Sequence, residues 1–354
     1  MNKYLLIVFF PLLIATFIAS FFVFNKEESY EEPIEIIVIE TKQLKKIPSE
    51  INAIYLTGPY LANENRMSKI LTLIKETEIN AAVIDVKDFS GRIYLEDSWV
   101  KMDEIVEKFH EKDVYAIARI AVFEDPILSS SKNSLAIKTS EGDLWETYTG
   151  LTWVDPSSKD AWDYNIEIAK RAWNLGFDEI NFDYIRFPTD GDLKNIKYPF
   201  FDKEITKRET MTEFYKYLRS ELKGMIISAD LFGLTTVIED IGIGQNIEDA
   251  SQYFDFVCPM VYPSHYANGF NGYVDPSEYP YGVVYKSLSK ANEKVNNIRP
   301  WLQAFDLLGY DYDQDEVQDQ IKATKDALID NYHGYMLWNS QNIYSKTDLT
   351  KIDE

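Results

Sequence analysis

An aspartate stands inside the otherwise apolar and aromatic segment NFDYIRFP, at residues 181–188. Burying a carboxylate in such surroundings costs free energy unless the group is paired or has a chemical task. Asp183 is therefore the first candidate for a catalytic nucleophile or base, and a structural pairing with Arg186 is the competing interpretation. Asp230 in the segment ISADLFG has the same character. Its competing interpretation is a buried aspartate that orients its neighbours.

Two facing carboxyl groups are the usual machinery for hydrolysing a glycosidic bond, about 5 Å apart in retaining enzymes and further apart in inverting ones. We expect Asp183 to act as nucleophile or base, and a second acid, Asp230 first and Glu124 second, to protonate the leaving oxygen. A dry site or a nearby negative charge would raise the pKa of that acid. Arg186 is expected to hold the other carboxylate ionised. The heights of the strand ends decide the separation, so the sequence leaves the stereochemical outcome open.

Eight short β-branched and aromatic segments alternate with amphipathic stretches from residue 51 onward, which is typical of a parallel sheet wrapped by helices. This pattern predicts an α/β fold, a (β/α)8 TIM barrel, and an open doubly wound sheet is the alternative. The expected strands are 51–57, 81–87, 114–123, 179–187, 225–232, 254–262, 298–305 and 333–339. The expected helices include 65–78, 158–176, 206–223, 276–296 and 313–329.

The carboxyl ends of barrel strands meet at one face, where polar residues carry the chemistry. The segments SLAIKT and LWETYTG, around residues 140–143, predict a β-hairpin insertion after strand 3 that forms part of the cleft or a lid. Aromatic residues near this face are expected to stack on sugar rings, namely Tyr148, Trp153, Tyr184, Tyr262, Tyr266 and Trp338. The strand ends predict a substrate-binding set of Asp88, Lys87, Arg119, Arg186, Tyr262, His265, Gln303, Trp338 and Asn339.

Several of these segments resemble a family of bacterial and archaeal glycoside hydrolases of the "domain of unknown function" type, DUF4015, in the TIM-barrel glycosidase superfamily. The resemblance covers about residues 52–340 and implies a barrel fold and a carbohydrate-active role, with Asp183 as the lead carboxylate and Asp230 next. A related barrel family carries Asp-Asp-Tyr on its fourth strand, where this chain has Phe182 at the first position. The resemblance rests on AIYLTGPY, VIDVKDFSGRIY, IARIAVFEDP, WVDPSSKDAWDYNIEIAKRA, GFDEINFDYIRFPTDG, ISADLFG, DFVCPMVYPSHY and GYMLWNSQN.

The composition narrows the classes of partner. A formal net charge of −22 disfavours binding to nucleic acid. The single cysteine, Cys258, lies in an apolar run and is expected to pack as a buried hydrophobic residue. The three histidines, His110, His265 and His333, are dispersed, so we predict no metal site and no cofactor.

An uncharged apolar run at residues 4–24 follows Lys3 and is long enough to cross a bilayer. We expect a transmembrane anchor or signal peptide at 1–25, a linker at 26–50 and the barrel at 51–354. The barrel is thus expected outside a cell membrane that the chain spans once, with secretion after signal cleavage as the alternative. The predicted function is hydrolysis of an extracellular or cell-envelope polysaccharide. The alternative is a non-catalytic carbohydrate-binding barrel of the cell surface.

Overall fold

The computed structural model describes residues 47–307, 309–347 and 349. The predicted anchor or signal at 1–25 and most of the predicted linker at 26–50 lie outside the described residues. Among the residues that are described, none of the helices has the length and apolar character needed to cross a membrane.

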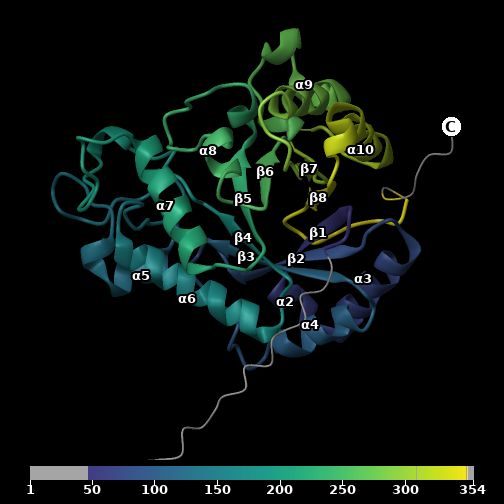
Figure 1. Ribbon diagram of the computed structural model, residues 1–354, viewed down its shortest axis with the longest axis horizontal. Helices are drawn as coiled ribbons and strands as arrows, with labels where there is room; N and C mark the ends of the chain where they lie inside the picture. Colours follow the sequence, from purple (N-terminus) through teal and green to yellow (C-terminus); the bar gives the residue numbers. More distant parts are fainter. Residues whose placement is uncertain (1–46, 308, 348, 350–354) are drawn as a thin grey trace, which may run out of the picture. The chain divides into compact units, whose positions relative to one another are not determined.

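Eight parallel strands close into a barrel in the order of the sequence (Figure 1). Strands β2, β3 and β4 are buried along their whole length, as expected of a parallel sheet covered by helices. The predicted barrel is confirmed, and the sheet is closed, not open and doubly wound. The strands are β1 Ile51–Thr57, β2 Ala81–Lys87, β3 Tyr115–Ala121, β4 Glu179–Asp183, β5 Ile227–Phe232, β6 Phe256–Met260, β7 Trp301–Gln303 and β8 Gly334–Trp338.

Helices lie outside the ring of strands, and several begin at a side-chain cap (Figure 1). Ser158 caps α6, and the capping boxes of α7 and α10 pair Thr206 with Glu209 and Asp313 with Glu316. The α-helices are α2 Gly58–Leu61, α3 Glu64–Glu76, α4 Met102–His110, α5 Pro126–Ser131, α6 Lys159–Leu175, α7 Lys207–Glu221, α8 Ile247–Ser251, α9 Pro280–Asn292 and α10 Gln314–Leu328. Short 3-10 helices are η1 Asn133–Leu135, η2 Leu193–Asn195, η3 Gly233–Thr236, η4 Pro263–His265, η5 Phe270–Gly272, η6 Pro276–Glu278 and η7 Ile329–Asn331.

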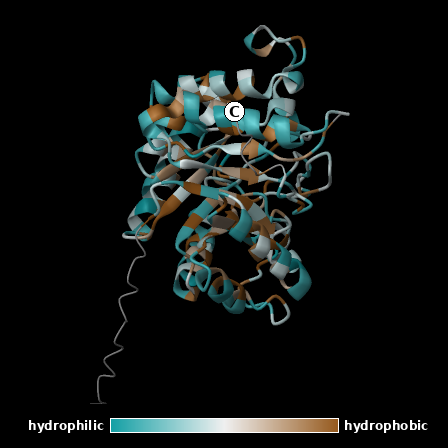
Figure 2. Cartoon of the chain, turned by 90° about the vertical axis from the view of Figure 1, so that its right-hand side faces the viewer, coloured by the Kyte–Doolittle hydropathy of each residue, from teal (hydrophilic) through white to brown (hydrophobic). Residues whose placement is uncertain are grey.

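Alternation along the strands divides the apolar core into two parts. One part fills the barrel interior and includes Tyr55, Val83, Ile117, Trp301 and Met336. The other lies between the strands and the helices. Figure 2 shows apolar residues along the central strands and a mixture of polar and apolar residues on the helices, as expected of helices with one face toward the barrel.

A register shift at the end of β2 changes which side chains face the barrel interior. Asp85 pairs with Arg119 on β3, but the next paired residue of β2 is Lys87, opposite Ile120. The extra residue, Val86, inverts the alternation at this point. Asp85 therefore faces inward with Arg119, whereas Lys87 faces outward with Ile120 toward the helices.

The long connection between β3 and α6 contains α5, η1 and antiparallel bridges. Lys138 pairs with Leu144, and the Thr139 N–H donates to the carbonyl of Asp143 across a turn in which Gly142 has a φ of 94°. The predicted hairpin is thus present as isolated bridges and not as two continuous strands. Tyr148, at a second turn in this connection, is 82% exposed.

Candidate active site

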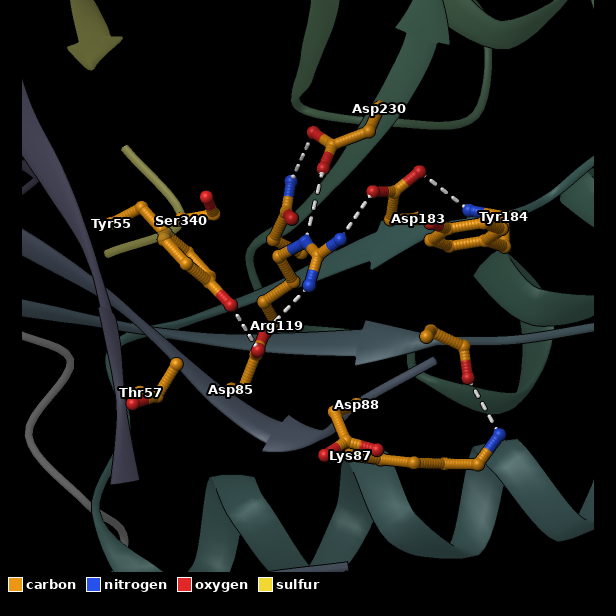
Figure 3. A network of polar contacts seen from close by, with 12 residues as sticks. Tyr55, Thr57, Asp85, Lys87, Asp88, Arg119, Asp183, Tyr184, Asp230 and Ser340 are labelled. Atoms are coloured by element: carbon orange, nitrogen blue, oxygen red, sulfur yellow. Dashed lines mark hydrogen bonds and ion pairs between the residues drawn. The ribbon is translucent and has the colours of Figure 1, made fainter. Parts of the chain in front are cut away.

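The buried guanidinium of Arg119 is the centre of the polar network at the carboxyl ends of the strands (Figure 3). Its Nη1 donates to Asp85 Oδ1 and its Nη2 to Asp183 Oδ2, each at 2.6 Å. Its Nε lies 3.8 Å from Asp230 Oδ2. Three carboxyl groups from β2, β4 and β5 therefore share one cation. Neighbouring barrel strands bring these residues together although 145 positions separate Asp85 from Asp230.

Asp183 is the last residue of β4, and the backbone after it holds its carboxylate in place. Tyr184 adopts a left-handed conformation with φ 55°, which ends the strand. Its N–H donates to Asp183 Oδ1 at 2.6 Å, while Oδ2 accepts from Arg119. With both oxygens accepting, one from a guanidinium, Asp183 is bound as a carboxylate.

Asp230 on β5 has a different environment. Its Oδ1 accepts from Asn181 Nδ2 at 2.8 Å and from Trp301 Nε1 at 2.7 Å, whereas its Oδ2 has no hydrogen-bond partner among the described residues. Burial raises the pKa of Asp230 well above its usual range, and the negative charge of Asp183 raises it further. Arg119 opposes this shift. Burial and the neighbouring charge of Asp183 therefore favour the protonated form of Asp230.

Asp85 closes the other side of the network. The Tyr55 hydroxyl donates to Asp85 Oδ2, and burial raises the pKa of Asp85. The Tyr55 ring stacks on Trp338 with centroids 3.9 Å apart, and Trp338 also lies over the Arg119 guanidinium at 4.8 Å. An aromatic wall thus covers the shared cation, and cation–π contact helps hold it.

A cavity of about 340 Å3 opens at this cluster, large enough for a sugar-sized group. Both Asp183 and Asp230 line it together with Arg119, so the predicted pair of carboxyl groups meets in one hollow. Of the six predicted stacking residues, the lining contains Tyr184, Tyr262, Tyr266 and Trp338, and it omits Tyr148 and Trp153. The remaining lining residues are Phe232, Gly233, Leu234, Met260, His265 and Trp301.

Glu124 and Arg186 lie beside the cavity and are not part of its lining. Burial raises the pKa of Glu124 to about 7, and the charge of Arg186 opposes that shift. Arg186 does not pair with Asp183. This corrects two expected roles of the arginine, the structural pairing with Asp183 and the stabilisation of an ionised carboxylate. Among the described residues no carboxylate lies within ion-pair distance of its guanidinium, which stands against the rings of Trp153, Tyr184 and Phe232. Arg119 takes the role predicted for Arg186.

Besides Arg186, four predicted substrate-binding residues do not line the cavity. Lys87 runs away from Arg119 and pairs with Asp125 at 2.7 Å, because the register shift turns it outward (Figure 3). Asp88 organises its own loop by accepting from Ser90, Arg92 and Tyr94. Gln303 and Asn339 bind loop backbone: Gln303 Oε1 accepts from the Ser264 N–H and its Nε2 donates to the Phe305 carbonyl, and Asn339 Nδ2 donates to the Ala304 carbonyl.

The predicted set lacks four residues of the network, namely Tyr55, Asp85, Asn181 and Trp301. Asp85 carries the same signal as Asp183, a charged residue inside the apolar strand AAVIDVK, and this signal could have identified it. Tyr55 and Trp301 carry no such signal, because aromatic residues in strands most often pack in a core. Among the described residues, no group of three or more His, Cys, Asp and Glu side chains is arranged to hold a metal ion.

Comparisons with known proteins agree with this architecture. The spore cortex-lytic enzyme SleL of Bacillus cereus shares 13% identity over 84% of this chain and 73% of its own, with a TM-score of 0.53. The α-galactosidase of Thermus thermophilus shares 11% sequence identity over 83% of this chain and 58% of its own, with a TM-score of 0.54.

The C-terminal domain of a chitinase-like protein from Desulfitobacterium hafniense shares 14% identity over 85% of this chain and 96% of its own, with a TM-score of 0.55. At such identities these likenesses establish the fold. No curated protein matches the sequence. The matched family covers residues 53–344, which include every strand but the first two residues of β1, and so the chain belongs to the family DUF4015, described as "Putative glycosyl hydrolase domain".

Proposed function

We propose that this protein is a glycoside hydrolase in which Asp183 acts as nucleophile or base and Asp230 as the acid. One observation carries the proposal: two carboxyl groups on adjacent strands face one cavity in different surroundings. Asp183 is bound by the guanidinium of Arg119, whereas burial and the charge of Asp183 raise the pKa of Asp230 well above its usual range. Such a divergence of two neighbouring acids is the basis of carboxylate acid–base catalysis.

The chemistry then follows from the positions of the two groups. The proton of Asp230 passes to the glycosidic oxygen as its bond to the anomeric carbon breaks, and the leaving alcohol departs neutral. Asp183 either bonds to that carbon, forming an ester that water later hydrolyses, or takes a proton from an attacking water. In the first case Asp230, now a carboxylate, removes a proton from the incoming water and so recovers its acid form. Glu124 is the second candidate for the acid, because its pKa is about 7.

The substrate that we propose is a polysaccharide of the cell envelope or the extracellular space. Six aromatic side chains line a cavity of the size of one sugar. A cortex-lytic enzyme and a chitinase-like protein share the fold. We also propose that residues 4–24 anchor the chain in the cell membrane with the barrel outside, or are removed on secretion; this rests on the sequence alone.

Hydrolysis of a panel of cell-wall and extracellular polysaccharides by wild type and Asp183→Asn tests the proposal. We expect product release by wild type and a fall in kcat of about a thousandfold or more in the variant. Asp155→Asn is a matched control, since Asp155 is fully buried but does not line the cavity and accepts from the backbone of Ser157 and Phe200. Glycan binding with no turnover by wild type would favour the non-catalytic alternative, and turnover that survives in Asp183→Asn would refute the assignment.

A further inference from the structure

The barrel interior next to Asp230 holds fully buried polar side chains that the proposed chemistry does not use. Glu179 and Asn181 come from β4, Ser228 from β5, and Arg299 precedes β7. Hydrogen bonds connect them in one unbroken chain that begins at Arg299 and ends at Asp230. Buried polar chains of this kind have a direction, since each hydroxyl and amide must divide its donors and acceptors among its neighbours.

The direction of this chain is fixed at its far end. Arg299 keeps its proton in any environment, and it forms an ion pair with Glu179 that holds the latter as a carboxylate, which only accepts. Ser228 must therefore donate its hydroxyl proton to Glu179, at 2.5 Å. The Ser228 oxygen is left to accept, and it receives the amide N–H of Asn181 at 3.1 Å.

The same amide nitrogen of Asn181 donates to Asp230 Oδ1 at 2.8 Å. Trp301 Nε1 can only donate, and it reaches the same oxygen at 2.7 Å. Both lone pairs of Oδ1 thus accept N–H groups, so a proton on this carboxyl group is excluded from Oδ1. The proton of Asp230 must then lie on Oδ2, which has no hydrogen-bond partner among the described residues.

Oδ2 is also the oxygen of Asp230 that faces the guanidinium of Arg119. It lies 3.8 Å from Arg119 Nε, and that nitrogen likewise has no hydrogen-bond partner among the described residues. At this distance the two groups form no hydrogen bond with one another. Each requires an acceptor, and a glycosidic oxygen of a substrate next to Asp183 would provide one.

We propose that Asn181 is a positioning residue that, together with Trp301, confines the proton of Asp230 to Oδ2. The chain Ser228–Glu179–Arg299 holds the Asn181 amide in the orientation that this requires. The inference rests on the proposed function in one respect only, the role of Asp230 as the acid. The location of the proton itself can be measured without turnover.

Infrared difference spectroscopy of the full chain tests this location. The carbonyl stretch of a protonated carboxyl moves to higher wavenumber when its carbonyl oxygen loses a donor. We expect a band of a protonated carboxyl that Asp230→Asn removes and that Asn181→Leu moves to higher wavenumber. Asn165→Leu is the matched control, because Asn165 is an equally buried amide on α6 that bonds Ala161 and Lys87 and not Asp230. It should leave the band in place.

Kinetics give a second measurement where a substrate is turned over. Loss of a donor to a group that changes charge should lower kcat by about ten- to a hundredfold in Asn181→Leu. The alkaline limit of the pH profile should move upward, since the lost bond favours the ionised form. Asn165→Leu should change neither.

If Asn181→Leu does not fold, Ser228→Ala, which frees the Asn181 amide to turn, should move the infrared band in the same direction by less. An unmoved band in Asn181→Leu, or no band lost in Asp230→Asn, overturns the inference. Absence of any hydrolysis with the expected infrared shifts would instead refute the proposed function and leave the proton assignment intact.

Discussion

Replacing Lys87 by methionine tests whether this residue serves the substrate, as its place at a strand end predicted, or the fold. Its Nζ pairs with Asp125 at 2.7 Å, and it also contacts the carbonyl oxygens of Ala121 and Val122 and the amide oxygen of Asn165. Both charged side chains are fully buried. Removing one member of a buried ion pair leaves the other charge without compensation, which costs about 3–5 kcal/mol.

For a domain of this size, each kcal/mol corresponds to roughly 2–4 °C in melting temperature, so Lys87→Met should lower Tm by roughly 10 °C. Thermal and urea denaturation measure this loss. Asp125→Asn added to Lys87→Met should recover part of it, because asparagine can still cap α5 by accepting from the Leu128 N–H as Asp125 does. The folded fraction of Lys87→Met should keep its kcat/KM within about twofold. An unchanged Tm with a large loss of kcat/KM would refute this reasoning and restore Lys87 to the substrate site.

Two further predictions concern the acid groups. Burial raises the pKa of Glu124 from 4.5 to about 7, so the folded protein binds this proton more tightly than the unfolded chain. The resulting stabilisation is complete below pH 4.5 and is lost as the pH rises toward about 7, by on the order of 3 kcal/mol relative to Glu124→Gln. Urea denaturation of wild type and Glu124→Gln across this pH range measures the loss. A difference in unfolding free energy that stays constant with pH would contradict the prediction. The register of β4 and β5 pairs Phe182 with Ala229. The next residues, Asp183 and Asp230, therefore lie at the same height on neighbouring strands, whose backbones are about 5 Å apart. We therefore expect retention of anomeric configuration, which proton NMR of the first-formed product detects, and inversion would show that the two carboxyl groups act across a wider gap.

The sequence predicts the barrel well, because alternating buried strands and amphipathic helices are local patterns. The bounds expected for β1 and β2 are those of the structure. Strand β4 ends four residues before its predicted end, since the left-handed conformation of Tyr184 breaks the extended run. Helix α4 was not identified, and its N-cap explains why: Lys101 has a φ of 51° and makes no side-chain capping bond.

Prediction of the site was limited by geometry that the sequence does not carry. Asp183, Asp230 and Arg119 were found because charged residues inside apolar strands are costly without a task. Strict alternation would place Asp85 and Lys87 on the same face of β2, but the register shifts by one residue between them and turns Lys87 outward. A pairing of Asp183 with Arg186 was the competing interpretation, and the structure shows no ion pair between them. The actual partner, Arg119, comes from the neighbouring strand, at the position next to Asn181 in the register.

The division of roles among the acids follows from how deeply each one is buried. Asp85, Asp183 and Asp230 surround one guanidinium, so full ionisation would leave an excess of two negative charges in a dry site. Asp230 is 1% exposed, Asp85 is 2% and Asp183 is 7%. Desolvation is the largest cause of the raised pKa of Asp85 and of Asp230, and both groups are more deeply buried than Asp183. The negative charge of Asp183 raises the pKa of Asp230 further. Asp230 is deeply buried and adjacent to Asp183, and it is therefore the carboxyl group that we propose as the acid.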